Sequence, residues 1–380
     1  MDCAASSVFS YLWNYQSYER LLQHEVGGTG LLREELPRTA HSKIKVVAVK
    51  FPGNLSDRVF AACWVWRQEA NGEILLVFGD IQDPGDMAET NSIIQADKRA
   101  SNAIRVATRG CFRLKPIAPN VCGVTLIQQG EVGGIIPRWV LNMAVKSSLS
   151  LVDVIRSRSQ RNGRAVDAEV QAAFPLPPCI GELDDQQQLI VDRCVALEQT
   201  EGCELVNWTQ INSSSPFVKM WSRLPEKRKG ERQLAIGRAS TTLDCSPNVG
   251  LAWWFDYMSR ERAKISLEEG NPARLFWKQT SAHDNVAATI KKAPFPLHIR
   301  EFVVRQLCVI NNGVLSYFTS SVDVTVDYGS KRLAGAVRAS STAVARFKPV
   351  EGRADQCEFL YVQHFGEQAR EDARRYDAMR

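Results

Sequence analysis

The stretch Met1–Gly28 reads MDCAASSVFSYLWNYQSYERLLQHEVGG, and Leu243–Gly270 reads LDCSPNVGLAWWFDYMSRERAKISLEEG. A shift of 242 residues (243 − 1) aligns the two stretches without a gap. The matched pairs include Asp2 and Asp244, Tyr15 and Tyr257, and Arg20 and Arg262. The same shift carries Lys50–Phe60 onto Lys292–Phe302, so the register persists well beyond the first helix. A period this long indicates two copies of a whole domain.

The length of 380 residues is enough for two or three domains, each with its own core. The sequence predicts a first domain over residues 1–158, a linker over 159–182 and a second domain over 183–380. The linker is polar at first and then reads Phe-Pro-Leu-Pro-Pro over Phe174–Pro178, which cannot continue a helix.

The first copy opens with an amphipathic helix and continues with alternating strands. Lys43–Val49 and Arg58–Gln68 are predicted strands, and Asn71-Gly72 is a hairpin turn because this pair tolerates positive φ. Asp83–Asn102 is polar without a period, which predicts a long loop. After Pro137, a residue favoured at the start of a helix, Arg138–Arg158 reads as a long helix with one apolar side.

The two copies are unequal at their ends. The second begins with an extra helix, Asp184–Gln199, and with two strands before the repeated part. The first lacks these elements. The second lacks the long apolar helix and ends in the strongly charged stretch Glu367–Arg380, which also reads as helical. Each copy is therefore missing a part that the other supplies.

These elements predict the α+β class. A curved antiparallel sheet with one apolar face needs a cover, and a helix with a broad apolar side provides one. A space under that helix larger than the side chains can fill suits an apolar ligand. We expect the helix Pro137–Arg158 to pack on the first sheet with Trp139, Met143, Leu151 and Ile155 turned inward, because short connections favour adjacent packing.

Three motifs resemble the START lipid-transfer domains. Lys292–Val303 carries Pro-Phe-Pro-Leu, then Arg, an acid, an aromatic residue and Val, like the strand-entry signature of that family. Lys50–Phe60 resembles a degraded form of the same signature. Gly133–Asn142, with Ile-Pro and a following Asn, resembles the entry to the family's C-terminal helix.

The resemblance implies two helix-grip domains, each a curved antiparallel sheet wrapped around a long helix and each incomplete at one end. It implies a lipid-binding or lipid-transfer protein that holds a sterol, phospholipid or other apolar ligand under the C-terminal helix. The residues expected to line that cavity are Trp139, Met143, Leu151, Ile155, Arg300 and Arg305. Arg58 and Arg300 match the signature arginine, for which hydrogen bonding to backbone is the alternative to ligand contact.

Composition argues against several other classes. A net charge of +5, spread along the chain, lacks the clustered basic residues of a nucleic-acid-binding surface. Ten cysteines without a Cys-x-x-Cys pair and five histidines predict no metal site, and no cofactor is expected. No apolar run approaches the ~20 residues of a membrane span. Without a signal peptide, a cytoplasmic location is predicted; transient contact with a membrane surface accompanies the lipid hypothesis.

Two alternatives to lipid binding remain at this stage. One is a non-catalytic interaction scaffold whose START-like domains have lost open cavities, a reading motivated by the degraded signature and the missing parts. The other is an enzyme that uses the cavity, which would require a buried His or carboxylate near a nucleophile. No motif of hydrolases, metalloproteases or phosphate-binding loops is present in the sequence, so we predict that the chain is not an enzyme.

Overall fold

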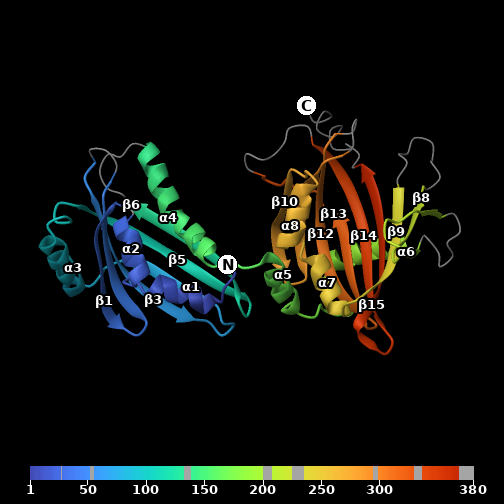
Figure 1. Cartoon of the computed structure of the whole chain (residues 1–380), viewed down its shortest axis with the longest axis horizontal. Helices are drawn as coiled ribbons and strands as arrows, with labels where there is room; N and C mark the ends of the chain where they lie inside the picture. The colour runs from blue at the N-terminus through green and yellow to red at the C-terminus, as the bar shows by residue number, and fades with distance from the viewer. Residues whose placement is uncertain are drawn as a thin grey trace. The chain divides into compact units, whose positions relative to one another are not determined.

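The computed structural model forms two compact units, Met1–Val170 and Gln171–Arg380 (Figure 1). The boundary falls inside the predicted linker, which contains helix α5 (Gly163–Ala172) and a short 3-10 turn, η1 (Ile180–Glu182). The structure describes residues 1–26, 28–51, 55–131, 138–199, 208–224, 235–293, 298–328 and 336–367.

The first unit is built on a six-stranded sheet in the order β1-β2-β3-β4-β5-β6, and all of these neighbours pair antiparallel. The strands are β1 (Gly30–Thr39), β2 (Ser42–Val49), β3 (Arg58–Gln68), β4 (Ile74–Asp80), β5 (Ile104–Ala118) and β6 (Val121–Glu131). The helices are α1 (Ala5–Trp13), α2 (Tyr18–Val26), α3 (Pro84–Ala96) and α4 (Arg138–Arg158). Strand β4 is short, and beyond its end β3 pairs directly with β5 in parallel.

One face of this sheet, the inner face, packs against α1 and the C-terminal half of α4. Leu12 of α1 and Ile155 of α4 are buried against Phe78 and Phe112, and Leu151 packs beside them. The predicted packing of the long helix on the first sheet is confirmed for Leu151 and Ile155. The side chains of Trp139 and Met143 lie outside the described residues.

The outer face of the first sheet has a separate core. Ile44, Val46 and Ala48 alternate along β2, as the period of two predicts, and they join a cluster with Ile94 of α3. The predicted loop over Asp83–Asn102 is wrong, because most of it is this helix.

Helix α3 was not predicted from the sequence because its apolar face is narrow. Its buried residues are Thr90 and Ile94, one turn apart, so no longer period develops. Its start carries local signals instead: Pro84 stands in the first turn, and Asp83 accepts a hydrogen bond from the Asp86 amide at 2.8 Å.

The second unit contains a nine-stranded sheet in the order β10-β11-β12-β13-β14-β15-β9-β8-β7. Its strands are β7 (Thr209–Ile211), β8 (Lys219–Arg223), β9 (Ala235–Leu243), β10 (Ala273–Ser281), β11 (Asp284–Lys291), β12 (Arg300–Asn311), β13 (Val314–Ser321), β14 (Val337–Val350) and β15 (Arg353–Glu367). Its helices are α6 (Asp185–Gln199), α7 (Pro247–Phe255) and α8 (Arg260–Glu268). The predicted front helix is confirmed as α6.

Helices cover both faces of the second sheet. On the inner face, Leu251 and Phe255 of α7 pack against Cys308, Tyr317 and Phe347. On the outer face, α6 packs against β13 and β14, with Ile190, Val191 and Cys194 buried beside Leu307 and Phe318, among others. The alternation of β12 explains this division, since Leu307 and Cys308 point to opposite faces.

The first sheet and β10–β15 share their pairing register. Val65 lies opposite Val77 in the first sheet, and Leu307, 242 residues after Val65, lies opposite Phe318 in the second. The short parallel pairing recurs as well, between β3 and β5 and between β12 and β14.

Some elements were not predicted or cannot be compared. Strands β1, β7, β10 and β11 were missed: β1 contains Glu34-Glu35 and Pro37, β7 has only three residues, and β11 is buried on both faces and so lacks a polar alternation. Parts of the START-like signatures, at 52–54, 133–137 and 294–297, lie outside the described residues, and so does the predicted charged helix after Glu367. Among the residues described, no helix is long and apolar enough to cross a membrane.

Candidate ligand-binding site

An apolar pocket of about 410 Å³ lies beside α7 in the second unit. It opens between this helix and strands β9, β14 and β15. Its lining includes Leu243, Val249, Trp253, Trp254, Phe347 and Phe359. Polar contributions come from Ser240 and Thr241 of β9. A pocket with this lining can bury an apolar group.

Local sequence signals place α7 against the sheet. Ser246 caps the helix by accepting a hydrogen bond from the Val249 amide, and Pro247 starts the first turn. Gly250 faces Phe347 so closely that a Cβ at this position would lie 2.9 Å from the phenyl ring. The glycine therefore permits the close approach that forms one wall of the pocket.

Aromatic rings and two phenols continue the inner face of the second unit. Trp254 lies 5.0 Å, between ring centroids, from both Phe359 and Tyr361. Burial raises the pKa of Tyr361 and raises that of Tyr317 well above its ordinary value. Both phenols therefore stay protonated at neutral pH and can donate hydrogen bonds.

A larger hollow of about 740 Å³ in the same unit is unsuited to an apolar ligand. Charged side chains contribute much of its lining: Glu198, Lys219, Arg238, Arg346, Lys348 and Glu358. Arg346 and Glu198 form an ion pair across it, with Nη2 and Oε2 2.6 Å apart. This hollow lies on the side of the sheet that α6 covers.

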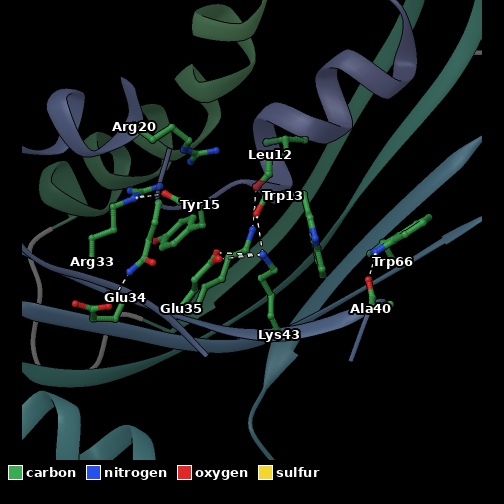
Figure 2. Close-up of polar contacts among 12 residues, drawn as sticks. Leu12, Trp13, Tyr15, Arg20, Arg33, Glu34, Glu35, Ala40, Lys43 and Trp66 are labelled. Atoms are coloured by element: carbon green, nitrogen blue, oxygen red, sulfur yellow. Dashed lines mark hydrogen bonds and ion pairs between the residues drawn. The ribbon is translucent and has the colours of Figure 1, made fainter. Parts of the chain in front are cut away.

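The inner face of the first unit carries two buried lysines, Lys43 and Lys45, of which Figure 2 labels Lys43. Lys45 donates to the carbonyl oxygen of Leu12 at 2.8 Å, and its Nζ lies 4.1 Å from the centre of the Trp64 ring. Lys43 donates to the carbonyl oxygen of Trp13 at 3.3 Å and pairs with Glu35 at 3.1 Å (Figure 2). Burial, with the charges of Arg20 and Lys43, lowers the pKa of Lys45 to about 6.

These lysines have a structural role. Leu12 and Trp13 end α1, and their carbonyl oxygens lack partners within the helix. Lys43 and Lys45 of β2 donate to them, and the ion-paired Lys43 also stabilises the negative end of the helix dipole. Neither lysine was predicted as a site residue. The available signal was polar residues alternating with Ile44 and Val46, which places lysines on the face opposite an apolar one.

A tyrosine–arginine arrangement is shared by both units. The Arg33 guanidinium lies 3.6 Å from the centre of the Tyr15 ring and its Nε donates to the Tyr15 carbonyl at 2.8 Å. In the same way, the Arg274 guanidinium lies 3.7 Å from the centre of the Tyr257 ring, and its Nε donates to the Tyr257 carbonyl at 2.6 Å. Because it occurs twice, this arrangement belongs to the framework that joins helix to strand.

A second shared contact involves Arg20 and Arg262. Arg20 donates to the Tyr11 carbonyl, and Arg262 donates to that of Trp253, 242 residues after Tyr11; both distances are 3.1 Å. Burial lowers the pKa of both arginines.

The arginines expected to line a cavity have other partners. Arg305 lies on the outer face of the second sheet, where it donates to Asp284 at 2.5 Å and to Gln186 of α6 at 3.3 Å. This placement differs from the expected cavity position. Arg305 precedes Leu307 by two residues on β12, so both side chains point to the outer face. Arg300 donates to the His298 carbonyl at 2.8 Å, and Arg58 is buried and donates to the Ser56 carbonyl. Both contacts fit the backbone-bonding alternative.

The pocket residues were not predicted as a group. Trp253 and Trp254 line the pocket, whereas the adjacent Phe255 is buried in the core. Only the pairing of β9 with β15 brings Leu243 opposite Cys357, beside α7.

No protein-family model matches this chain, and no curated protein matches it by sequence. Its fold is similar to that of solved START-domain structures, at low identity. The human StAR-related lipid transfer protein 5 is 12% identical, with 50% of this chain and 89% of that chain covered and a TM-score of 0.36. The lipid transfer and protein localization domain of human StarD13 is 15% identical, with 50% and 87% covered and a TM-score of 0.34.

Another match extends over both units. The di-domain ARO/CYC StfQ from the steffimycin biosynthetic pathway is 10% identical, with 99% of this chain and 89% of that chain covered and a TM-score of 0.24. At such TM-scores the likenesses identify neither a ligand nor a site.

Proposed function

We propose that this chain is a cytoplasmic, non-catalytic lipid-binding protein built from two START-like domains of helix-grip fold. In this proposal the pocket beside α7 holds the apolar part of the ligand. The observation that carries it is the lining of that pocket by aliphatic and aromatic side chains, with a volume of about 410 Å³. The START-like motifs at Lys50–Phe60, Gly133–Asn142 and Lys292–Val303 support the same reading.

The chemistry of the pocket favours a ligand with one apolar tail or ring system. Burial of hydrocarbon is worth about 0.8 kcal/mol per CH₂, so a lipid chain can bind with few polar contacts. The Thr241 hydroxyl already donates to the Phe217 carbonyl at 2.8 Å, so burial of hydrocarbon is the main source of affinity in this proposal. A sterol and a free fatty acid both meet this condition, whereas a phospholipid would have one of its two chains outside the pocket.

The two units have different roles in this proposal. The inner face of the first unit carries packed rings: Trp64 and Phe78 stack with centroids 4.5 Å apart, and Phe112 lies 6.2 Å from Phe78. A face packed by its own aromatic side chains supports a scaffold role for the first unit. Ligand binding is therefore assigned to the second.

Mass spectrometry of lipids extracted from the purified protein tests the proposal. The decisive variant is Val249→Trp, which places an indole in the pocket from an α7 position that is 39% exposed. We expect it to reduce bound lipid at least tenfold. Ile265→Trp is the matched control, since it adds the same ring at a 44% exposed position on α8. Equal lipid recovery from both variants, or none from the folded wild-type protein, would contradict the proposal.

A further inference from the structure

Four apolar side chains form a continuous row across the outer face of the first sheet. Val65 lies opposite Val77, Val77 opposite Cys111, and Cys111 opposite Ile127. The row crosses β3, β4, β5 and β6 at right angles to the strands. Val65 is 46% exposed, Val77 49% and Ile127 70%, while Cys111 is partly buried.

The register-matched row in the second sheet is covered. It consists of Leu307, Phe318, Val344 and Val362, each opposite the next in the same manner. These four side chains are at most 2% exposed, because Ile190, Val191 and Cys194 of α6 pack on them. The same surface is thus sealed by a helix in one unit and open to solvent in the other.

The charges around the two rows also correspond. Arg346 follows Val344 by two residues on β14 and pairs with Glu198 of α6. Arg113 follows Cys111 by two residues on β5, and its side chain remains 58% exposed while it contacts Glu73. Arg109, two residues before Cys111 on the same face, adds a further exposed cation.

We propose that this row binds an acidic amphipathic helix supplied by a partner protein, in the way that α6 covers the second sheet. The row spans four strands, about 14 Å at the spacing of paired strands. A helix of about ten residues has that length. The apolar stripe of the partner helix lies on Val65, Val77 and Ile127, and an acidic side chain one turn beyond the stripe pairs with Arg113.

The α6 sequence itself is the probe. A labelled peptide of residues 184–199, acetylated and amidated, is titrated against the full chain, whose second sheet is already covered by its own α6. We expect saturable binding by fluorescence anisotropy. The variant Val77→Lys with Ile127→Lys should weaken it at least tenfold. The matched control, Val145→Lys with Leu149→Lys, changes two exposed residues of α4 and should leave binding unchanged.

A charge swap tests the predicted ion pair. The peptide with Glu198→Arg should bind the wild-type chain more weakly than the original peptide, and the chain variant Arg113→Glu should restore its binding. Absence of binding by the original peptide, or equal binding to the Lys variants and the wild type, would overturn the proposal.

Disulfide trapping locates the site independently. Cys194 of α6 belongs to the cluster that contains Val344, and Cys111 occupies the position of Val344 in the first sheet. An α6 peptide whose Cys194 is activated as a thiopyridyl disulfide should therefore cross-link to Cys111. Peptide mapping by mass spectrometry identifies the modified cysteine. Cross-linking at the exposed Cys179 in place of Cys111 would refute the assignment.

Discussion

At the scale of single residues, some contacts occur in both units, whereas others occur in only one. Tyr15 with Arg33 and Tyr257 with Arg274 adopt the same geometry, so these pairs stabilise the helix-to-strand connection in each unit. Lys45 has no such counterpart, since the residue 242 positions later is Ala287. A buried lysine is costly to keep charged, and its effect on stability depends on pH.

We predict that Lys45→Met removes a pH dependence of the first unit. The folded pKa of about 6 lies below the ordinary 10.5, so between these values the unfolded chain binds more protons than the folded one. The wild-type free energy of unfolding should therefore rise with pH, by up to about 1.4 kcal/mol per unit, and this slope should be absent in Lys45→Met.

Urea unfolding monitored by tryptophan fluorescence between pH 6.5 and 9 measures both slopes. Lys115→Met, at an exposed position, serves as the control and should follow the wild type. Parallel profiles for Lys45→Met and the wild type would show that Lys45 keeps its proton on folding.

A second residue-scale prediction concerns Gly250. In Gly250→Ala the new Cβ meets the Phe347 ring at 2.9 Å, so α7 or the ring must move. Overpacking costs about 1–3 kcal/mol, and the better helix propensity of Ala offsets about 1 kcal/mol of this. We expect the second unit to lose about 1 kcal/mol of stability in denaturant titrations. Gly237→Ala, with open space around the Cβ, should show no comparable steric cost; a fully stable Gly250→Ala would contradict the account.

At the scale of elements, each sheet is stabilised by helices on both faces, but with different ones. In the first unit α1 and α4 cover the inner face and α3 part of the outer face. In the second, α7 covers the inner face and α6 the outer. The front helix therefore accounts for the difference between the sealed row at Phe318 and the open row at Val77.

Helix α4 allows a test with two adjacent residues. Ile155 is 2% exposed against the first sheet, while Val154 is 40% exposed. Ile155→Asp should destabilise the first unit by about 3–5 kcal/mol, because it buries an unpaired charge. Val154→Asp should change stability by less than about 0.5 kcal/mol. Calorimetric transitions measure the difference, and equal effects of the two variants would show that α4 does not pack as described.

At the scale of the whole molecule, the chain comprises two units, each with its own hydrophobic clusters. Clusters around Phe112 and Ile44 stabilise the first unit, and clusters around Phe347 and Phe318 stabilise the second. We therefore expect separable unfolding transitions, and a core substitution in one unit should shift only its own transition.

Asp284→Ala tests this expectation in the second unit. Asp284 is fully buried and pairs with Arg305, whose side chain is 14% exposed, so its removal leaves a largely buried cation without its carboxylate. A loss of about 3–5 kcal/mol is expected, confined to the second transition in differential scanning calorimetry. Glu358→Ala breaks a pair with Lys348 in which both side chains are more than half exposed, and it should cost under about 1 kcal/mol. Equal shifts of both transitions by Asp284→Ala would contradict independent unfolding.

The sequence by itself determined the features that depend on local periodicity and on repetition. The 242-residue shift predicted corresponding elements in the two halves, and alternation predicted β2 with Ile44 and Val46 on one face. The long helix α4 was predicted from its apolar side and from Pro137 before it. The strand and helix signals lie within short stretches of chain, and the repeat is found by comparing the sequence with itself, so none of them requires knowledge of distant contacts.

Only the tertiary structure decided which faces are covered and where a ligand can enter. Arg305 lies on the face of the sheet that α6 covers, where it donates to Gln186. The local sequence does not show which face a helix covers, so this position could not be predicted. The pocket beside Val249 requires β9, β14 and β15 to meet α7, although these segments are far apart in sequence. Long-range pairing brings them together, so the sequence could predict the strands and helices but not the space between them.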